Sequence, residues 1–538
     1  MNIRRFIFFV LMAFSFATPV FGAEYQWSVK VKGFVSPETN ANPEAFLWIP
    51  SNCSQVKAVV VGQHNMCEET IFEHPEFRKT MAELGFAIVW ITPGIDQQWD
   101  VKNGCQKVFD EMMKELAEKS GYTELQFAPV VPLGHSAMAT FPWNFAAWNP
   151  GRTLAIISYH GDAPRTNLTG YGGENLEWGR NRNIDGIPGL MIEGEYEWWE
   201  ARVNPALAFR MMYPESCISF LCDAGHGHFD VSEDVVDYMC LFLKKAATYR
   251  LPKQQSLDQA TVLTKVDVMK GWLAERWHPV QPKRSKAAPF MQYKGDAHDA
   301  FWYFDQEIAV ATEQYYAKNR NKKHQFIGLT HNGSLIPYRP NRHVKYDLSN
   351  LKPGADGITY HFHAVFTDSL HQQFTNAHSK TLIHIERIDG PIQKIDDTTF
   401  KVKFNRMGLN NTKRTNSFTL CAYNDGDAQY KSAVQEFSMK INYPLKEGKR
   451  QAIFFPALQN VSQTEKEVVL LATTDSGLPV SYYVKEGPVE EKEGRMVFTE
   501  IPPRAKFPIT VTVVAWQLGL ERTVQSAEPV ERSFLIVK

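Results

Sequence analysis

A regular alternation of short apolar runs with amphipathic stretches, from Phe46 to about Leu251, constrains the fold of this chain more than any other feature. Short apolar runs are typical of buried parallel strands, and amphipathic stretches are typical of the helices that connect them. We therefore expect an open, doubly wound and mostly parallel sheet. The predicted strands span residues 56–62, 86–92, 127–133, 153–159, 188–193 and 217–222, and residues 103–119 form a predicted helix.

The periodicity changes beyond Gln281–Pro289, a basic and proline-containing stretch that is typical of a linker. A helical segment is expected before it, around Val266–Trp277. Beyond it, apolar and polar residues alternate, for example over 360–366 and 400–404, as they do in half-buried antiparallel strands. Further runs of this kind, separated by turn-forming residues, predict one or two β-sandwich modules.

The first 23 residues are typical of a cleaved signal peptide. Two arginines precede an apolar run from Phe6 to Phe16, and small residues follow, so we expect cleavage after Gly22 or Ala23. The run is shorter than the roughly 20 apolar residues of a membrane anchor. We therefore expect a secreted protein, periplasmic or extracellular, with no membrane attachment after cleavage. The net charge of −1 gives no reason to expect a nucleic-acid partner.

Seven cysteines form no paired Cys-x-x-Cys motif, and their odd number leaves at least one free thiol or an intermolecular bridge. Export permits disulfides, and Cys67 with Cys105 is the candidate pair. Buried free thiols are the alternative. No zinc signature of the His-Glu-x-x-His kind occurs either, so we expect neither a metal nor another cofactor.

The run from Pro132 to Ala139 (PLGHSAMA) follows a predicted strand and precedes a helix, which is the setting of a nucleophile elbow. A serine on such a turn is exposed at the sheet edge, so Ser136 is the candidate nucleophile. Here the chain resembles the α/β-hydrolase superfamily. Met138 departs from the family pattern, because a small residue is expected at that position.

The resemblance implies a triad in the chain order serine, acid, histidine. The acid is expected just after the strand at 188–193, where Glu197 is the first candidate and Glu195 the alternative. The histidine is expected between the last core strand and the helix that begins near Ser232. His228 fits the family arrangement better, and His226 remains the alternative.

The same resemblance implies an oxyanion hole that is built from backbone amides. The amide of Ala137 is expected to be one donor. The other is expected from the loop after the first core strand, at Asn65 or Met66. In this chemistry the histidine takes the serine proton, and the carboxylate holds the histidine in the correct tautomer.

Aromatic and cationic residues predicted near the active-site mouth suggest a carbohydrate substrate. The layout looks like that of secreted α/β-hydrolase pectin methylesterases with a C-terminal β-sandwich. This resemblance implies a serine carbohydrate esterase that hydrolyses methyl esters of galacturonate in a pectin-like polysaccharide. An acetyl esterase acting on xylan or pectin is one alternative, and a non-catalytic glycan-binding protein is another. The predicted substrate-binding residues are Arg165, Arg180, Arg182, Arg202, Trp178 and Trp198.

The fold class expected from these patterns is an α/β-hydrolase fold followed by all-β sandwich modules. We expect no catalytic group after about residue 290, so a chain ending near Pro252 is predicted to keep activity on a small ester. The predicted parts are a signal peptide over 1–23, the catalytic domain over 24–252, a helical segment and linker over 253–290, a β-sandwich over 291–444 and a second, immunoglobulin-like sandwich over 445–538.

Overall fold

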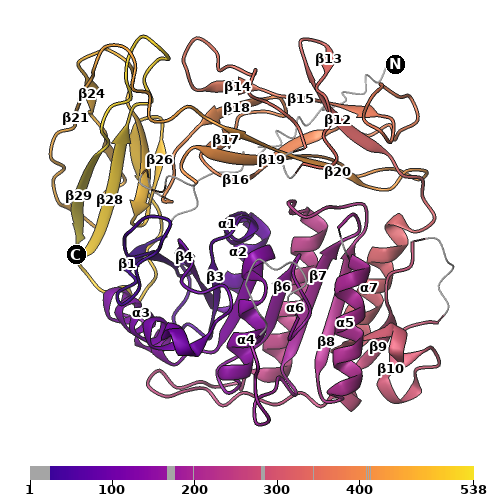
Figure 1. Ribbon diagram of the computed structural model, residues 1–538. Coiled ribbons are helices and arrows are strands. Elements are labelled where there is room, and N and C mark those ends of the chain that lie inside the picture. Colours follow the sequence, from indigo (N-terminus) through magenta and orange to yellow (C-terminus); the bar gives the residue numbers. More distant parts are fainter. Residues whose placement is uncertain are drawn as a thin grey trace, which may run out of the picture.

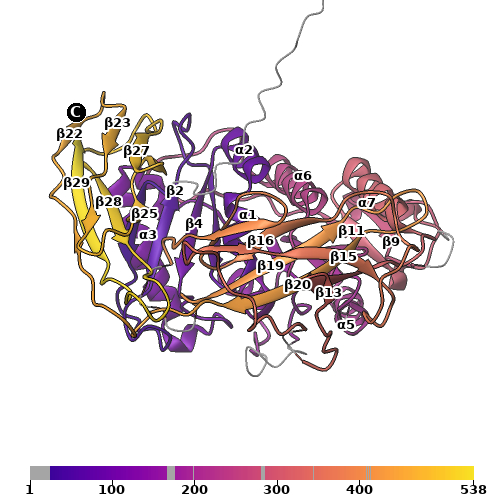
Figure 2. The same ribbon diagram turned by 90° about the horizontal axis from the view of Figure 1, so that it is seen from above.

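The computed structural model shows an α/β unit with one β-rich module over its top and a second β-rich module at its side (Figure 1). Figure 2 shows strands of the first module crossing over the α/β unit. The structure describes residues 25–166, 176–197, 199–279, 285–342, 345–407, 409, 411 and 414–538. The predicted signal peptide lies outside these ranges. Within them, no helix combines the length and the apolar character that a membrane span requires.

The α/β unit is built on an eight-stranded sheet with the order β1-β2-β4-β3-β5-β6-β7-β8. β2 runs antiparallel to both of its neighbours, and β3 to β8 are parallel. This order and these directions are those of the α/β-hydrolase fold, so the predicted fold class is confirmed. The strands are β1 (Trp27–Lys30), β2 (Glu44–Trp48), β3 (Ala58–Gln63), β4 (Phe86–Thr92), β5 (Val130–His135), β6 (Ile156–Tyr159), β7 (Pro188–Gly194) and β8 (Cys217–Asp223).

Alternate residues of the central strands belong to two separate apolar cores, one on each face of the sheet. In β3, for example, Val60 packs into one core and Val61 into the other. Burial on both faces explains why these strands are continuous apolar runs in the sequence. The helices are α1 (Cys67–Glu73), α2 (Pro75–Leu84), α3 (Cys105–Ser120), α4 (Phe141–Trp148), α5 (Trp199–Met212), α6 (Glu233–Arg250) and α7 (Gln306–Asn319).

The candidate disulfide between Cys67 and Cys105 does not form. Cys67 begins α1 and packs into one core, whereas Cys105 begins α3 and packs into the other. The sheet therefore separates the two sulfur atoms. All seven cysteines are buried free thiols, which was the alternative expectation.

The segment after α6 differs from its prediction. The stretch expected to be helical around Val266–Trp277 contains a single 3₁₀ turn and then strand β9 (Trp272–Glu275). β9 pairs with β10 (Ala288–Pro289) and with β11 (Ala300–Tyr303), so long-range pairing overrides the local pattern. β11 and the following helix α7 pack into the same core as β8. The α/β unit therefore extends beyond the predicted boundaries at 252 and 290.

The middle module has three small antiparallel sheets and an apolar core, to which residues of the C-terminal module such as Val514 and Trp516 also contribute. The predicted strand over 360–366 divides at Phe362, because the residues before it pair with β18 and those after it pair with β12. Its strands are β12 (Phe326–His331), β13 (Ser334–Leu335), β14 (Thr359–His361), β15 (His363–Thr367), β16 (His384–Asp389), β17 (Ile392–Lys394), β18 (Thr399–Val402), β19 (Ser417–Asn424) and β20 (Ala433–Lys440).

The C-terminal module has a separate core and packs beside α3 of the α/β unit. Arg504 forms an ion pair with Glu124, and Glu486 with Lys119, so this module is anchored to the α/β unit by charged groups. Its strands are β21 (Ile453–Phe454), β22 (Val461–Ser462), β23 (Glu467–Val469), β24 (Thr473–Thr474), β25 (Ser481–Glu486), β26 (Val489–Lys492), β27 (Arg495–Phe498), β28 (Ile509–Trp516) and β29 (Val530–Val537).

Candidate active site

Ser136 stands on a sharp turn between β5 and α4. Its φ angle is 55°, in the left-handed region that a non-glycine residue rarely adopts. The turn is tight, because a Cβ atom on Gly134 would lie 2.0 Å from the carbonyl oxygen of Met138. Glycine at position 134 therefore permits the chain to reverse, and the reversal exposes the Ser136 hydroxyl at the carboxyl edge of the sheet.

The bulky Met138 is accommodated by a second glycine. Its Cε atom lies 2.3 Å from the place where a Cβ atom on Gly94 would be. Met138 is buried there, next to the loop that follows β4. The departure from the family pattern thus leaves the turn intact, because space is provided by a distant residue.

The structure brings Ser136, His228 and Glu197 together. Nε2 of His228 lies 2.7 Å from the Ser136 hydroxyl oxygen, and Nδ1 of His228 bonds to the Glu197 carboxylate. His228 lies in the loop between β8 and α6, and Glu197 follows β7. The carboxyl ends of these parallel strands meet at one edge of the sheet, which explains why the three side chains converge.

The two alternative residues have other partners. His226 lies between Asp223 and Asp230, at 3.7 and 2.5 Å, and these carboxylates raise its pKa to about 9 although burial opposes the shift. Glu195 forms a buried ion pair with Lys431 at 2.8 Å. Neither side chain is hydrogen-bonded to Ser136 or His228 in the described part of the chain.

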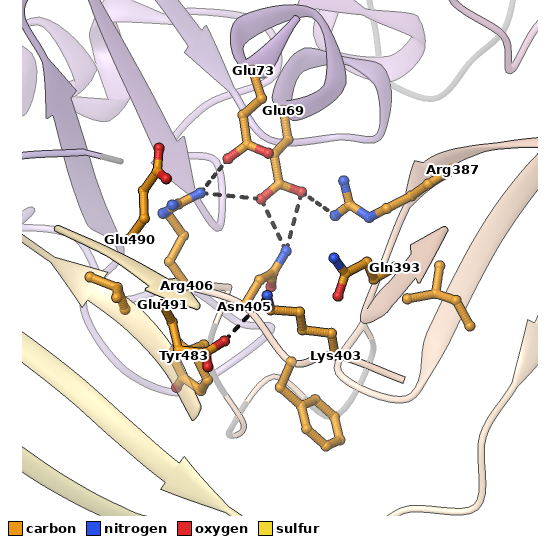
Figure 3. A pocket seen from close by; sticks show the side chains of 13 residues that line it. Glu69, Glu73, Arg387, Gln393, Lys403, Asn405, Arg406, Tyr483, Glu490 and Glu491 are labelled. Atoms are coloured by element: carbon orange, nitrogen blue, oxygen red, sulfur yellow. Dashed lines mark hydrogen bonds and ion pairs between the residues drawn. The ribbon is translucent and has the colours of Figure 1, made fainter. Parts of the chain in front are cut away.

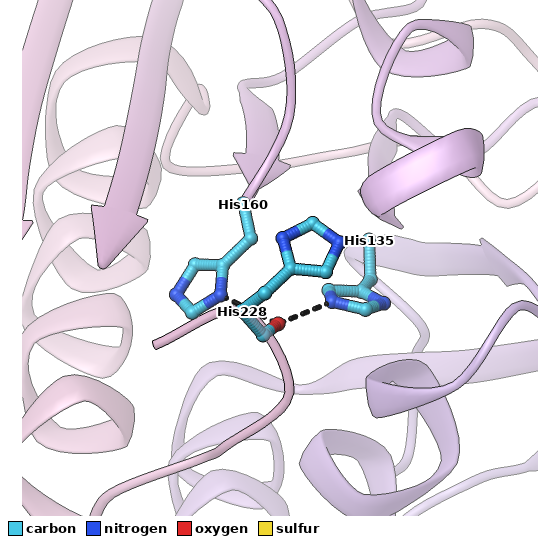
Figure 4. Close-up of side chains that lie close together, drawn as sticks. All are labelled: His135, His160 and His228. Atoms are coloured by element: carbon cyan, nitrogen blue, oxygen red, sulfur yellow. Dashed lines mark hydrogen bonds between the residues drawn. The ribbon is translucent and has the colours of Figure 1, made fainter. Parts of the chain in front are cut away.

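Two further histidines hold the backbone of His228 (Figure 4). His135 Nε2 and His160 Nδ1 lie 2.9 and 2.8 Å from the His228 carbonyl oxygen, to which each donates its N–H. Burial lowers the pKa of His135 well below its ordinary value and that of His160 to about 3, so both rings are neutral. Sequence reasoning missed both residues. Their positions at the ends of β5 and β6 were the available signal.

Arg202 was predicted to hold substrate, but it is 1% exposed and lies under the triad. Its guanidinium group lies 3.6 Å from Glu197, 3.1 Å from Glu193 and 3.3 Å from Asp162. Burial raises the pKa of Glu197 to about 8, and the positive charge of Arg202 opposes this shift. The charge of Arg202 therefore favours the ionised form of Glu197, and its buried guanidinium group is not accessible to a substrate.

Of the other predicted substrate residues, the four that the structure describes do not line the cavity at Ser136. Trp178 is buried and donates to Asn144, so its indole face is covered. Arg165 bonds to Tyr213 and Glu177, and Arg182 lies 4.4 Å from the ring of Trp148, at the end of α4 remote from the turn. Arg180 is exposed. Trp198 lies outside the described residues.

The predicted oxyanion donors are only partly available. The amides of Asn65 and Met66 both donate to a carboxylate oxygen of buried Glu68, each at 2.9 Å. They are therefore not free to bind an oxyanion in this structure. Ala137, the residue after Ser136, lines the cavity at Ser136, and its amide stays the predicted oxyanion donor. The Asn65 side chain donates to the His135 carbonyl at 3.1 Å, so it fixes the residue before the nucleophile.

Ser136 opens into a cavity of about 910 Å³ between the α/β unit and the middle module. The middle module, which was predicted to contain no catalytic group, provides much of the cavity wall. The chain separation of these residues from Ser136 explains why no local pattern identifies them. The polar and aromatic residues that it contributes include Phe326, Tyr338, Arg342, Lys345, His371 and Glu436.

The middle module also holds the loop after β3, residues 64–66. Arg414 donates to the Asn65 carbonyl oxygen at 2.6 Å. His64 Nε2 lies 3.2 Å from Asp389 of β16, and both side chains are buried. This loop is therefore held between the sheet of the α/β unit and the middle module.

An ion-pair cluster extends the same contact to α1 (Figure 3). Glu69 bonds to Arg387 at 2.7 Å and to Asn405 at 3.0 Å, and Arg406 bonds to Glu73. Glu69 is fully buried, so its carboxylate depends on these partners from the middle module for compensation of its charge. The middle module is thus fixed over the active site by charged groups.

No protein-family model matches the chain, and no curated protein matches its sequence. Among solved structures, S-formylglutathione hydrolase from Agrobacterium tumefaciens aligns with 14% identity and a TM-score of 0.30, over 41% of this chain and 94% of its own. The Staphylococcus aureus enzyme of the same name aligns with 12% identity and a TM-score of 0.29, over 42% and 98%. Est1E from Butyrivibrio proteoclasticus aligns with 16% identity and a TM-score of 0.28, over 42% and 99%.

Proposed function

We propose that this protein is a serine hydrolase of carboxylic esters. The observation that carries the proposal is the continuous contact from the Ser136 hydroxyl through the His228 ring to the Glu197 carboxylate. A serine hydroxyl is a weak nucleophile until a neighbouring base removes its proton. In this proposal His228 is that base, and Glu197 accepts its Nδ1 proton and stabilises the imidazolium.

In this proposal Ser136 attacks the ester carbonyl and His228 takes its proton. The tetrahedral oxyanion is stabilised by the Ala137 amide. His228 then protonates the departing alcohol, and water, deprotonated by the same histidine, hydrolyses the acyl-enzyme. The carbonyl of His228 is fixed by two neutral imidazole donors, so the ring keeps its place through both steps.

The finer part of the proposal is a carbohydrate ester, with the methyl ester of a pectin-like galacturonate as the first candidate. The size and polar lining of the cavity support a substrate larger than a simple alkyl ester. Arg342 and Lys345 of the middle module can hold neighbouring sugar carboxylates, in place of the arginines expected from the sequence. An acetyl ester of xylan or pectin would use the same catalytic groups. We also propose that the protein acts after export, which the predicted signal peptide would direct.

The test is hydrolysis of a panel of esters by the full chain and its Ser136→Ala variant. The panel contains 4-nitrophenyl acetate, methyl-esterified pectin and acetylated xylan, with release of nitrophenol, methanol or acetate measured. The wild type should hydrolyse the aryl ester and at least one polysaccharide ester. The folded variant should lose about a thousandfold or more of this activity. A folded Ser136→Ala variant that keeps more than a few per cent of it would exclude Ser136 as the nucleophile.

A further inference from the structure

Glu436 has a position in the cavity that the triad does not explain. It lies on β20, where alternate residues such as Phe437 pack into the core of the middle module. The carboxylate of Glu436 points the other way, and its Oε2 atom lies 3.8 Å from where a Cβ on Gly227 would be. Gly227 directly precedes His228, so this carboxyl group reaches the cavity wall beside the candidate base.

The Glu436 carboxyl has no hydrogen-bonded or ion-paired side chain as partner among the described residues. Burial raises its pKa to about 7, a hydrogen bond from its own backbone N–H opposes this rise, and the charge of Asp230 adds to it. Lys345 is close enough to oppose that shift, but its ammonium group donates to the Pro340 carbonyl. The carboxyl group is partly exposed on the cavity wall, so hydroxyl groups of a bound ligand can reach its remaining acceptor positions.

Two other features of the same cavity indicate which kind of ligand would donate hydrogen bonds to Glu436. Tyr338 and His371 both line the cavity and stack on each other with ring centroids 4.1 Å apart, so an outward ring face of this aromatic pair can pack against a sugar ring. Arg342 and Lys345 bring positive charges into the cavity, so a cationic ligand would be repelled. Hydroxyl groups on a neutral or anionic sugar satisfy both conditions.

We propose that Glu436 is a specificity-determining residue that accepts hydrogen bonds from sugar hydroxyl groups next to the scissile ester. This inference rests on the proposed function, since it names the substrate class of the same site. An ionised carboxylate offers two acceptor oxygens, which can bind two adjacent hydroxyl groups. The middle module would thus determine which esters reach Ser136.

The test measures binding directly, so that it does not depend on turnover. In the full chain carrying Ser136→Ala, xylotriose and methyl-esterified trigalacturonate are titrated by calorimetry, with and without Glu436→Gln. We expect at least one of these sugars to bind, and Glu436→Gln to weaken its binding about tenfold or more, as for loss of a charged acceptor. Glu386→Gln is the matched control. Burial also raises the pKa of Glu386, but it bonds to Lys394 and does not line this cavity.

Three results would overturn the inference. These are no binding of either sugar, equal binding with and without Glu436→Gln, and binding of choline that is lost in the variant, which would indicate a cationic ligand. Thermal melting of each variant shows whether it is folded. If the sugars bind through Glu436 while the wild type hydrolyses no ester, the proposed function fails and the sugar site stands.

Discussion

At the scale of single residues, Glu197 has the environment that most affects the chemistry. Burial raises its pKa to about 8. Only the ionised form can accept the Nδ1 proton of His228 and leave Nε2 free to act as a base. The folded enzyme should therefore be inactive where Glu197 is protonated, and kcat/KM should rise as pH increases toward about 8. A pH profile of kcat/KM on a neutral aryl ester measures this.

Two variants make the pH prediction specific to Glu197. Glu197→Gln should lower kcat/KM by roughly a thousandfold to ten-thousandfold and remove the rising limb. Glu195→Gln is the control, because Glu195 bonds to Lys431 instead of His228. If Glu195→Gln instead removed the rising limb of the pH profile and Glu197→Gln kept it, the triad acid would be Glu195 and the assignment to Glu197 would be wrong.

The sequence was informative about residues whose function follows from a local pattern. Ser136 stands in the elbow, and Glu197 and His228 follow the ends of two recognisable strands. Arg202 could not be placed in the same way, because only the fold shows that its charge lies between three buried carboxylates. Its basic character alone suggested a surface role.

At the scale of elements, the loop after β3 links the middle module to the nucleophile. Arg414 holds the Asn65 carbonyl, and the Asn65 side chain holds the carbonyl of His135. His135 in turn precedes Ser136 and donates to the His228 carbonyl. Arg414 is therefore a positioning residue that acts through Asn65.

We expect Arg414→Ala to lower kcat on a small ester by about tenfold to a hundredfold with little change in KM, because misplaced catalytic groups mainly affect the transition state. Arg414→Lys should recover part of the loss. Arg495→Ala, which breaks an exposed ion pair with Glu467 in the C-terminal module, is the control. Steady-state kinetics distinguish the outcomes, and a rise in KM alone would argue against a positioning role.

Secondary structure could be predicted from the sequence where burial on both faces of the sheet makes a strand a continuous apolar run. The six predicted core strands correspond to β3 through β8, with ends that differ by a few residues. The helix predicted around Val266–Trp277 was wrong, because residues of this segment form β9 by pairing with β11 further along the chain. The alternating run over 360–366 was predicted as one strand, but in the structure its two halves pair in two different sheets.

At the scale of the whole molecule, the middle module is part of the active site. It lines the cavity at Ser136 and is bonded to α1 and to the loop after β3. These contacts join residues more than 300 positions apart in the sequence, so no local pattern could reveal them. The predicted activity of a chain ending near Pro252 is therefore no longer expected. Such a chain would also lack β11 and α7, which complete the core beside β8.

We propose that Ser136 is the activated nucleophile of this assembled site. The most direct test is covalent labelling of the full chain with a fluorophosphonate, followed by peptide mass mapping. We expect one adduct, on Ser136, which is absent in Ser136→Ala and strongly reduced in His228→Ala. An adduct on another serine, or rapid labelling of Ser136 that persists in His228→Ala, would contradict it.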